Sequence, residues 1–432
     1  MNNSLKTSLS PTFVIALILS LIVLVLAVGF TQPQEFSTIS YTLEVLKFWQ
    51  KGFWGLLEFT LQMVLILVFG HTLAISKPVN RLLIKISKKV KTNTQAVLIT
   101  GITAMVGGYI NWGFGLILGA VLAREIGNRA RDSGLQINYP LVAASGYLGM
   151  LVWHGGLSGS APLKVAETGH FLQDQIGIIS IGDTIFSKSN LLINLILVIV
   201  IGIVLLILSK RKVQKLFYPI KTENNVSANG KDSLGLFLGL FILLLGISDF
   251  FLSPQALVFF DLNYVNFMLF GAGLLLFKSL SSYIEAIKIA LSGAVEIILQ
   301  FPFYAGILGV LQFSGLLVLF SEWMIGVSTG ETFPLLSFVS AGLVNLFIPS
   351  GGGQWAIQGP IIMDAAVKLG LKPANLVMAF SYGDQISNML QPFWALPLLS
   401  ITGVAAKEIL RYTFFFFLAA LIVFGVAVFF LL

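Results

Sequence analysis

The 432-residue chain has no cysteine and only three histidines, His71, His154 and His170. The lack of cysteine excludes disulfides, thiolate metal sites and cysteine nucleophiles. The histidines lie far apart in the sequence and do not have the spacing of a metal site. A membrane-embedded enzyme would need a nucleophile with its base, or a metal cluster. We therefore expect no metal, no cofactor and no enzymatic activity.

Charged residues are also scarce, at 10% of the chain, whereas soluble domains contain about 25%. Hydrophobic residues make up 56%. The net charge of +7 does not indicate a nucleic-acid partner, because Lys and Arg fall between apolar segments and not on one soluble face. This composition predicts an all-α polytopic membrane protein whose surroundings are the lipid bilayer.

Nine apolar stretches reach the roughly 20 residues that a helix needs to cross the hydrocarbon core of a membrane. They begin near Thr12, Phe53, Tyr139, Asn190, Leu234, Leu262, Ile289, Ala374 and Tyr412. The first is predicted to be a span and not a signal peptide, because no small-residue cleavage site follows it. Two further stretches, 96–123 and 333–363, contain Gly, Asn, Pro or Ser at their centres, which interrupt a helix. Each is predicted to be a re-entrant hairpin.

The basic residues predict the orientation in the membrane, because Lys and Arg accumulate in cytoplasmic loops. With the N-terminus in the cytoplasm, 20 of the 26 basic residues fall on the inner side. Residues 77–91 then face the cytoplasm and residues 322–331 face outward. We therefore expect a multi-pass protein of a bacterial inner membrane with a cytoplasmic N-terminus.

The two halves of the sequence resemble each other. Residues 55–62 and 293–300 share Gly, Glu, Leu and Gln at an offset of 238, and residues 141–162 match 376–397 at an offset of 235. The limits that we predict are a first repeat over 1–209, a cytoplasmic linker with an unmatched span over 210–252, and a second repeat over 253–432. The unmatched span inverts the second repeat, so the two hairpins enter from opposite sides and their tips meet near the midplane, as in many secondary transporters.

The hairpin tips are candidate substrate sites. In each tip, backbone N–H groups precede an apolar half-helix, and a helix N-terminus attracts a carboxylate. Asn111 and Ser350 add side-chain donors. Close helix packing is the alternative role for the glycines. The tip residues predicted to contact a substrate are Asn111, Trp112, Gly113, Gly115, Ser350, Gly351, Gly352 and Gly353.

A second pair of interruptions follows the hairpins, at 153–160 and 388–394. The side chains there that can hydrogen-bond the polar head of a small substrate are Ser158, Ser160, Asn388 and Gln391. The aromatic side chains that can surround an apolar tail, or pack in the core or against lipid, are Trp112, Trp153, Phe393 and Trp394.

Ionisable residues inside membrane segments are costly, so each is a candidate for binding a coupling ion or proton. Glu58 and Glu296 lie near membrane edges and recur in both repeats, which also fits a scaffold role. Asp384 lies one turn before an interruption and is the main candidate. His154 lies in the first interruption and can titrate near neutral pH, although a structural hydrogen bond is the commoner role for a single histidine.

Five motifs, at residues 110–115, 158–163, 300–306, 349–353 and 391–397, together resemble the bacterial short-chain fatty acid transporter family, the AtoE-like proteins. The resemblance extends from about Phe48 to the C-terminus. It implies uptake of short-chain acids such as acetoacetate or butyrate by an elevator-like carrier of the ion transporter superfamily. Neither the tips nor the second interruptions contain Lys or Arg, which is compatible with a small carboxylate substrate of single charge.

The alternatives are a carrier for dicarboxylates or other organic anions of the same superfamily, and a passive anion channel, because selectivity filters also use loops. Either a proton or sodium could drive a symport. We favour the proton, because a weak acid is readily carried with one and the sequence has no distinctive sodium motif. A homodimer is compatible with the sequence.

Overall fold

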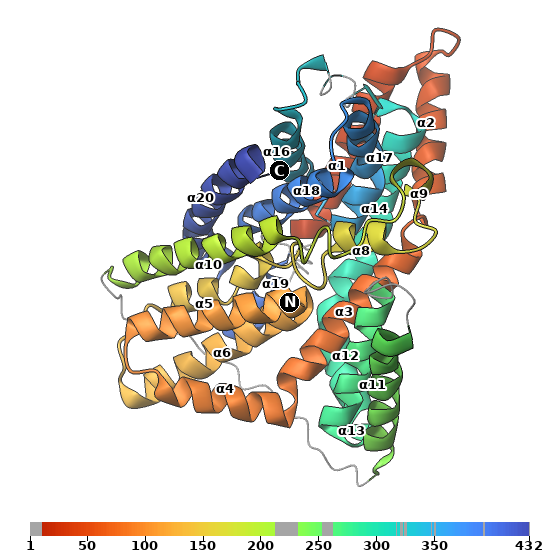
Figure 1. Ribbon diagram of the computed structural model, residues 1–432. Helices are drawn as coiled ribbons and strands as arrows, with labels where there is room; N and C mark the ends of the chain where they lie inside the picture. Colours follow the sequence, from red (N-terminus) through yellow and green to blue (C-terminus); the bar gives the residue numbers. More distant parts are fainter. Residues whose placement is uncertain are drawn as a thin grey trace, which may run out of the picture.

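A computed structural model describes residues 11–211, 232–252, 262–316, 318–319, 323, 326–346, 348–349, 351–391 and 394–431. Most of the described residues are helical and none of them lies in a strand (Figure 1). The all-helical fold expected from the composition is therefore confirmed. Most of the predicted polar linker lies outside the described residues.

The helices of the first half run from α1 to α10. Their bounds are α1 Pro11–Thr31, α2 Thr38–Gly52, α3 Leu57–Ile75, α4 Lys77–Lys89, α5 Asn93–Ile110, α6 Trp112–Ser133, α7 Tyr139–Ser145, the 3-10 helix η1 Leu148–Leu151, α8 Ser160–Ala166, α9 Gln173–Ile176 and α10 Lys188–Ser209. Those of the second half are α11 Leu234–Leu252, α12 Leu262–Phe277, α13 Leu280–Leu291, η2 Ser292–Ala294, α14 Val295–Phe313, α16 Phe333–Asn345, α17 Gly351–Lys368, α18 Pro373–Ser387, η3 Asn388–Leu390, α19 Leu396–Thr402 and α20 Ala406–Leu431.

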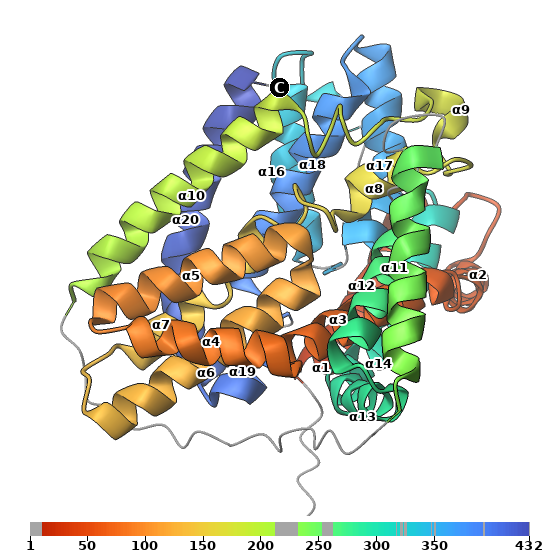
Figure 2. The same ribbon diagram turned by 60° about the horizontal axis from the view of Figure 1, so that its bottom comes forward.

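These helices form two groups that lie side by side (Figures 1 and 2). The first group contains α1 to α3 and α11 to α14, in which α14 packs against α1, α2 and α3 and α12 packs against α3 and α11. The second group contains α5 to α10 and α16 to α20, in which α16 packs along α18 and α10 along α20. The main contact between the groups is that of α3 with α6. The interrupted segments of both halves belong to the second group.

The number of uninterrupted spans is smaller than expected. Among the described residues, α10 and α20 alone are long and apolar enough to cross a membrane unbroken. Two bent pairs of helices are also long and apolar enough when each pair is taken as one span: α3 with α4, bent by 61°, and α13 with α14, bent by 44°. The predicted span from Tyr139 is wrong, because its helix ends at Ser145. Residues 139–156 are all buried, so their apolar character reflects packing inside the protein and not contact with lipid. The predicted span from Ala374 likewise ends at Ser387.

The first predicted hairpin consists of α5 and α6, which pack together and are interrupted only at Asn111. The interruption expected in the stretch 107–115 falls at Asn111, whereas Gly108 and Gly115 lie inside the two helices. A Cβ added at Gly115 would lie 2.4 Å from the Gly108 Cα. These glycines therefore allow the two helices to touch through their backbones. The second hairpin consists of α16 and α17, and whether either hairpin re-enters the membrane stays a prediction.

The helix bounds recur between the halves. Helices α3 and α14 begin 238 residues apart and end 238 residues apart, at the offset of the sequence match. The inverted relation of the halves and the limits of the two repeats stay predictions.

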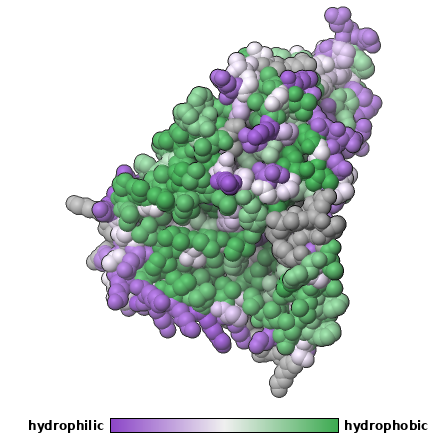
Figure 3. Space-filling model, in the orientation of Figure 1, coloured by the Kyte–Doolittle hydropathy of each residue, from purple (hydrophilic) through white to green (hydrophobic). Residues whose placement is uncertain are grey.

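The surface is apolar over much of its middle, with hydrophilic residues toward the lower edge and the upper right of the view (Figure 3). Large apolar side chains are exposed along α10, α11 and α20, including Leu195, Phe237 and Ile422. A surface of this kind requires lipid around it, because soluble proteins rarely expose large contiguous apolar patches.

The predicted topology can be tested with single cysteines, since the chain has none. Lys85 on α4 and Glu331 before α16 are both exposed, at opposite ends of the molecule (Figure 1). In intact cells, a membrane-impermeant maleimide should label the Glu331→Cys variant and should label the Lys85→Cys variant only after lysis. Labelling of the Lys85→Cys variant in intact cells would overturn the orientation.

Candidate functional site

A small cavity lies between the two helix groups, where the interrupted segments meet. Its volume is about 10 Å³, about the space that one water molecule requires. The residues that line it are Trp112, Met150, Trp153, Ser160, Phe301, Gly351 and Trp394. The structure thus brings together five residues that the sequence analysis singled out. Met150 and Phe301 were missed, although Phe301 lies in one of the five motifs.

Three polar groups on this lining have no hydrogen-bond partner among the described residues. They are the indole N–H groups of Trp112 and Trp153 and the hydroxyl of Ser160, and all three are buried. An indole N–H can only donate, and a serine hydroxyl can donate as well. An unpaired buried polar group costs about 1–3 kcal/mol. Residues that line the cavity therefore hold three unpaired donors close to aromatic side chains.

His154 and Asp384 form a buried pair beside the cavity. The His154 Nδ1 lies 2.5 Å from the Asp384 Oδ2, and the two side chains are 0% and 1% exposed. The backbone N–H of Ala161 donates to His154 Nε2 at 3.1 Å. Since Nε2 accepts, Nδ1 carries the hydrogen and donates it to Asp384. The other carboxylate oxygen, Asp384 Oδ1, has no partner among the described residues.

The pair contacts two residues that line the cavity. The His154 ring stacks on Trp153, with ring centroids 4.4 Å apart and planes inclined by 21°. A Cβ added at Gly351 would lie 2.8 Å from His154 Cε1 and 3.1 Å from Asp384 Oδ2. Only glycine therefore fits at the start of α17, which packs directly over the pair.

The two interruptions are also joined by hydrogen bonds that the sequence did not reveal. The His154 backbone N–H donates to Gln385 Oε1 at 3.1 Å, and the Tyr147 hydroxyl donates to the Asn388 carbonyl at 3.2 Å. In the sequence, Gln385 directly follows the candidate acid Asp384, and this was the only signal that could have identified Gln385. These bonds hold the first interruption against the second.

Asn111 forms the N-cap of α6. Its Oδ1 accepts the backbone N–H of Phe114 at 2.8 Å, and its Nδ2 has no partner among the described residues. Ser158 fixes the same tip, because its hydroxyl accepts the backbone N–H of Trp112 at 3.0 Å. The structure therefore gives Asn111 and Ser158 a positioning role at the tip.

Asn345, at the end of α16, organises the second interruption and was missed by the sequence analysis. Its amide Nδ2 donates to the Asp384 carbonyl at 2.9 Å, to Ser387 Oγ at 2.7 Å and to Asn388 Oδ1 at 3.3 Å. The backbone carbonyl of Asn345 accepts a hydrogen bond from the Gln391 side-chain amide at 2.5 Å. Asn388 and Gln391 therefore hold the interruption together, and the Asn388 Nδ2 is buried without a partner among the described residues.

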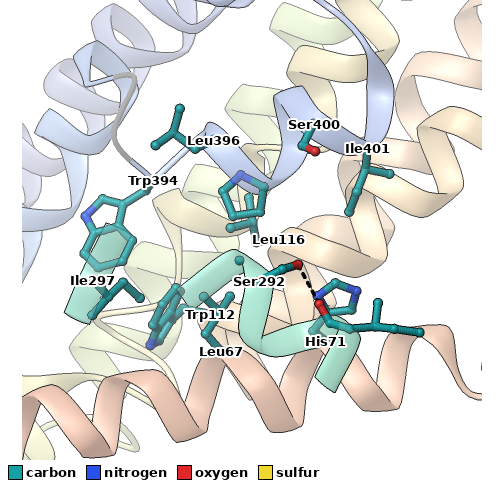
Figure 4. Close-up of a pocket in the computed structure, with 13 residues that line it drawn as sticks. Leu67, His71, Trp112, Leu116, Ser292, Ile297, Trp394, Leu396, Ser400 and Ile401 are labelled. Carbon is teal, nitrogen blue, oxygen red and sulfur yellow. Dashed lines mark hydrogen bonds between the residues drawn. The ribbon is translucent and has the colours of Figure 1, made fainter. Parts of the chain in front are cut away.

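A larger pocket of about 360 Å³ lies on the other side of two tryptophans (Figure 4). Trp112 and Trp394 line both the pocket and the small cavity, and their rings meet edge to face with centroids 5.0 Å apart. Leu67 and His71 of α3 also line the pocket, together with Ser292, whose hydroxyl donates to the Ile289 carbonyl. We call this pocket the vestibule. The tryptophan pair separates the vestibule from the cavity.

The remaining predicted residues lie away from the cavity lining or outside the description. Glu58 is exposed in the first turn of α3. Gly113 packs against the α3 backbone, and the Gly115 N–H is already paired with the Asn111 carbonyl. Gly352 and Gly353 belong to the first turn of α17. The residues or side chains that the structure does not describe are Ser350, Phe393 and the side chain of Glu296.

The chain matches known proteins both in sequence and in fold. Residues 1–431 match the sequence model of the family described as short chain fatty acid transporter. A candidate short-chain fatty acid transporter of Escherichia coli (strain K12) is 37% identical, over 98% of this chain and 96% of the relative. One of Haemophilus influenzae (strain Rd) is 34% identical, over 94% and 92%. The crystal structure of the Alcanivorax borkumensis YdaH transporter, described as having an unusual topology, superposes with a TM-score of 0.52 over 96% of both chains at 15% identity.

The apolar helical fold and these matches define the class as a multi-pass membrane transporter. Within that class, the chain belongs to the short-chain fatty acid transporter family. The likeness to the YdaH transporter concerns the fold alone. The family resemblance inferred from the five motifs is confirmed.

The cap at the first tip leads to a stability prediction. Asn111→Ala removes the acceptor for the Phe114 amide and should lower the free energy of unfolding by about 1 kcal/mol. Asn111→Ser keeps an oxygen acceptor at the N-cap and should remain close to wild type. Thermal unfolding of the detergent-solubilised variants measures both effects. Equal stability of the alanine variant and wild type would contradict the capping role.

Proposed function

We propose that the protein is a secondary active transporter that takes up short-chain monocarboxylates of the acetoacetate or butyrate type together with a proton. The observation that carries this proposal is the set of three unpaired donors, from Trp112, Trp153 and Ser160, on an otherwise aromatic cavity. Neutral donors can bind one carboxylate, and the aromatic walls can accept a short alkyl chain. Membership of the family supports the same substrate class.

The charge of the site supports a monocarboxylate over a dicarboxylate. Neither the cavity nor the vestibule is lined by Lys or Arg among the described residues. A second carboxylate would need further donors or a formal positive charge, because an unpaired charge in an apolar site is costly. A single carboxylate needs only the neutral donors that are present.

Asp384 supports coupling to a proton. It lies directly behind Gly351, so its negative charge would repel a carboxylate bound in the cavity. A proton on Asp384 Oδ1, the oxygen without a described partner, removes this repulsion and leaves the bond from His154 intact. Proton and anion then favour each other's binding, and linkage makes that effect reciprocal.

Sodium fits this arrangement less well. A sodium ion needs several oxygen ligands, whereas one oxygen of Asp384 is already engaged by the His154 N–H. The amide Nδ2 of Asn345 donates to the Asp384 carbonyl and occupies the adjacent backbone oxygen too. We therefore propose that the pair exchanges a proton and does not bind sodium.

The position of the cavity supports access by movement of the two helix groups. The cavity is too small for butyrate as it stands, so binding requires the aromatic side chains to separate. Trp112 and Trp394 stand between the cavity and the vestibule, and Phe301 comes from the first group. We propose that substrate passes between the two tryptophans and that relative motion of the groups exposes the cavity to each side, as in an elevator-like carrier.

The proposal is tested most directly with purified protein in liposomes. Imposed inward proton gradients should drive accumulation of labelled butyrate, whereas sodium gradients at constant pH should not. Unlabelled short monocarboxylates should compete and dicarboxylates should not. Uptake driven equally by either gradient, or competition by dicarboxylates alone, would overturn the assignment. Equilibration without accumulation would indicate a channel.

The donors lead to a prediction about affinity. Ser160→Ala removes a hydroxyl, and Trp153→Phe removes an indole N–H while it keeps an aromatic ring. A hydrogen bond to a charged group contributes about 1.5–3 kcal/mol, so each variant should bind butyrate about ten- to a hundredfold more weakly. Ser145→Ala is the matched control, because that buried hydroxyl is already bonded to the Leu141 carbonyl. Wild-type affinity in both site variants would remove these donors from the site.

Asp384→Asn tests the coupling, since it keeps size but cannot titrate. It should abolish accumulation driven by a proton gradient while exchange of labelled for unlabelled butyrate continues. Wild-type uptake should fall as external pH rises, and the variant's exchange should lose that dependence. Asp364→Asn is the control, because Asp364 is an exposed acid paired with Lys368. Full accumulation by Asp384→Asn under the same gradient would remove Asp384 from the mechanism.

A further inference from the structure

Helix α4 carries a concentration of positive charge that the transport site does not use. Its sequence is Lys-Pro-Val-Asn-Arg-Leu-Leu-Ile-Lys-Ile-Ser-Lys-Lys, with no acidic residue. The exposed basic residues of α4 and the turn that follows are Lys77, Arg81, Lys85, Lys88, Lys89 and Lys91. Among the described residues, none of these six forms an ion pair with a carboxylate.

The spacing places these charges on one side of the helix. Lys77, Arg81 and Lys85 follow each other at intervals of four residues and Lys88 comes three later, so they form a stripe along one face. Lys88 and Lys89 could serve only to balance the helix dipole at the C-terminal end. The dipole gives no reason for Lys77, Arg81 and Lys85, which lie before the last turn. Neutralising the positive charge of the stripe therefore requires an anion from outside the described residues.

The bend between α3 and α4 is the geometry expected of a helix that lies at a membrane surface. Helix α3, which is apolar, bends by 61° into α4 at Ser76. A helix that leaves a span at this angle runs along the interface. Leu83 is buried against the protein, and the Arg129 guanidinium donates to the Ser87 carbonyl to hold α4 on α6. Leu82 is 55% exposed between Arg81 and Leu83, which gives the outer side an apolar contact as well.

We propose that α4 is an interfacial helix whose basic stripe binds the phosphate headgroups of anionic phospholipids. Basic residues with apolar neighbours on a helix in the interface plane are the combination that anionic bilayers attract. A soluble acidic partner would leave Leu82 exposed to water, whereas the acyl region next to the headgroups covers it. The bound lipid also holds the junction of α3 with the first hairpin, because α4 is the segment that connects them.

Native mass spectrometry of the detergent-purified full chain tests the proposal. Titration with phosphatidylglycerol should give lipid adducts at lower concentration than titration with phosphatidylcholine. Each basic residue near an anionic surface contributes about fivefold to affinity. The variant Arg81→Gln/Lys85→Gln/Lys88→Gln should therefore lose about a hundredfold in affinity for phosphatidylglycerol, with no change for phosphatidylcholine.

A control variant removes the same charge elsewhere. Lys47, Lys288 and Lys368 each pair with an acid three or four residues away, so their replacement by Gln should leave phosphatidylglycerol binding intact. Thermal unfolding reports whether each variant is folded, and Lys85→Gln/Lys88→Gln replaces the triple variant if that one is not. Equal lipid binding by stripe variant and wild type would overturn the proposal, as would equal loss in the control variant. Displacement of the lipid by inorganic phosphate at matched concentration would reassign the stripe to free phosphate.

Discussion

The hydrogen bond between His154 and Asp384 joins segments 230 residues apart, at the points where each half of the chain is interrupted. A carboxylate inside an apolar protein is costly unless it is paired, so the two interruptions must stay together as long as Asp384 is charged. The tautomer of His154 is set by the Ala161 amide, which ties the pair to α8. Trp153 and Gly351 pack directly against the pair, so their positions depend on it. The pair therefore lies in direct contact with two residues of the cavity lining.

Interrupted helices release backbone groups that must find partners without water. At the first interruption the Leu157 N–H donates to the Tyr109 carbonyl at 2.7 Å, and Ser158 accepts the Trp112 N–H. Glycines make such contacts feasible, because a Cβ at Gly156 would lie 2.4 Å from that same Tyr109 carbonyl oxygen. Close to these paired backbone groups, the indole N–H groups of Trp112 and Trp153 and the hydroxyl of Ser160 have no partner among the described residues.

The cavity and the vestibule meet at Trp112 and Trp394, which line both of them. The vestibule is bounded by α3 and α13 on one side and by α6 and α19 on the other, so it follows the boundary between the two helix groups. Helix α4 continues α3 beyond that boundary and connects it to the first hairpin. A lipid-bound α4 would hold one end of this connection at the membrane surface while the groups move.

The sequence by itself determined the membrane class, the family and the position of the first tip, because composition, motifs and the Gly- and Asn-containing stretch 107–115 are local properties. It also singled out Asp384 and His154, since ionisable residues are rare in apolar segments. Only the tertiary structure decided that these two are partners and that Asn345 holds the second interruption. It also decided that the apolar stretch from Tyr139 is a buried, broken segment. Hydrophobicity reports burial but not whether lipid or protein surrounds a segment, and pairing across 230 residues depends on how distant helices pack.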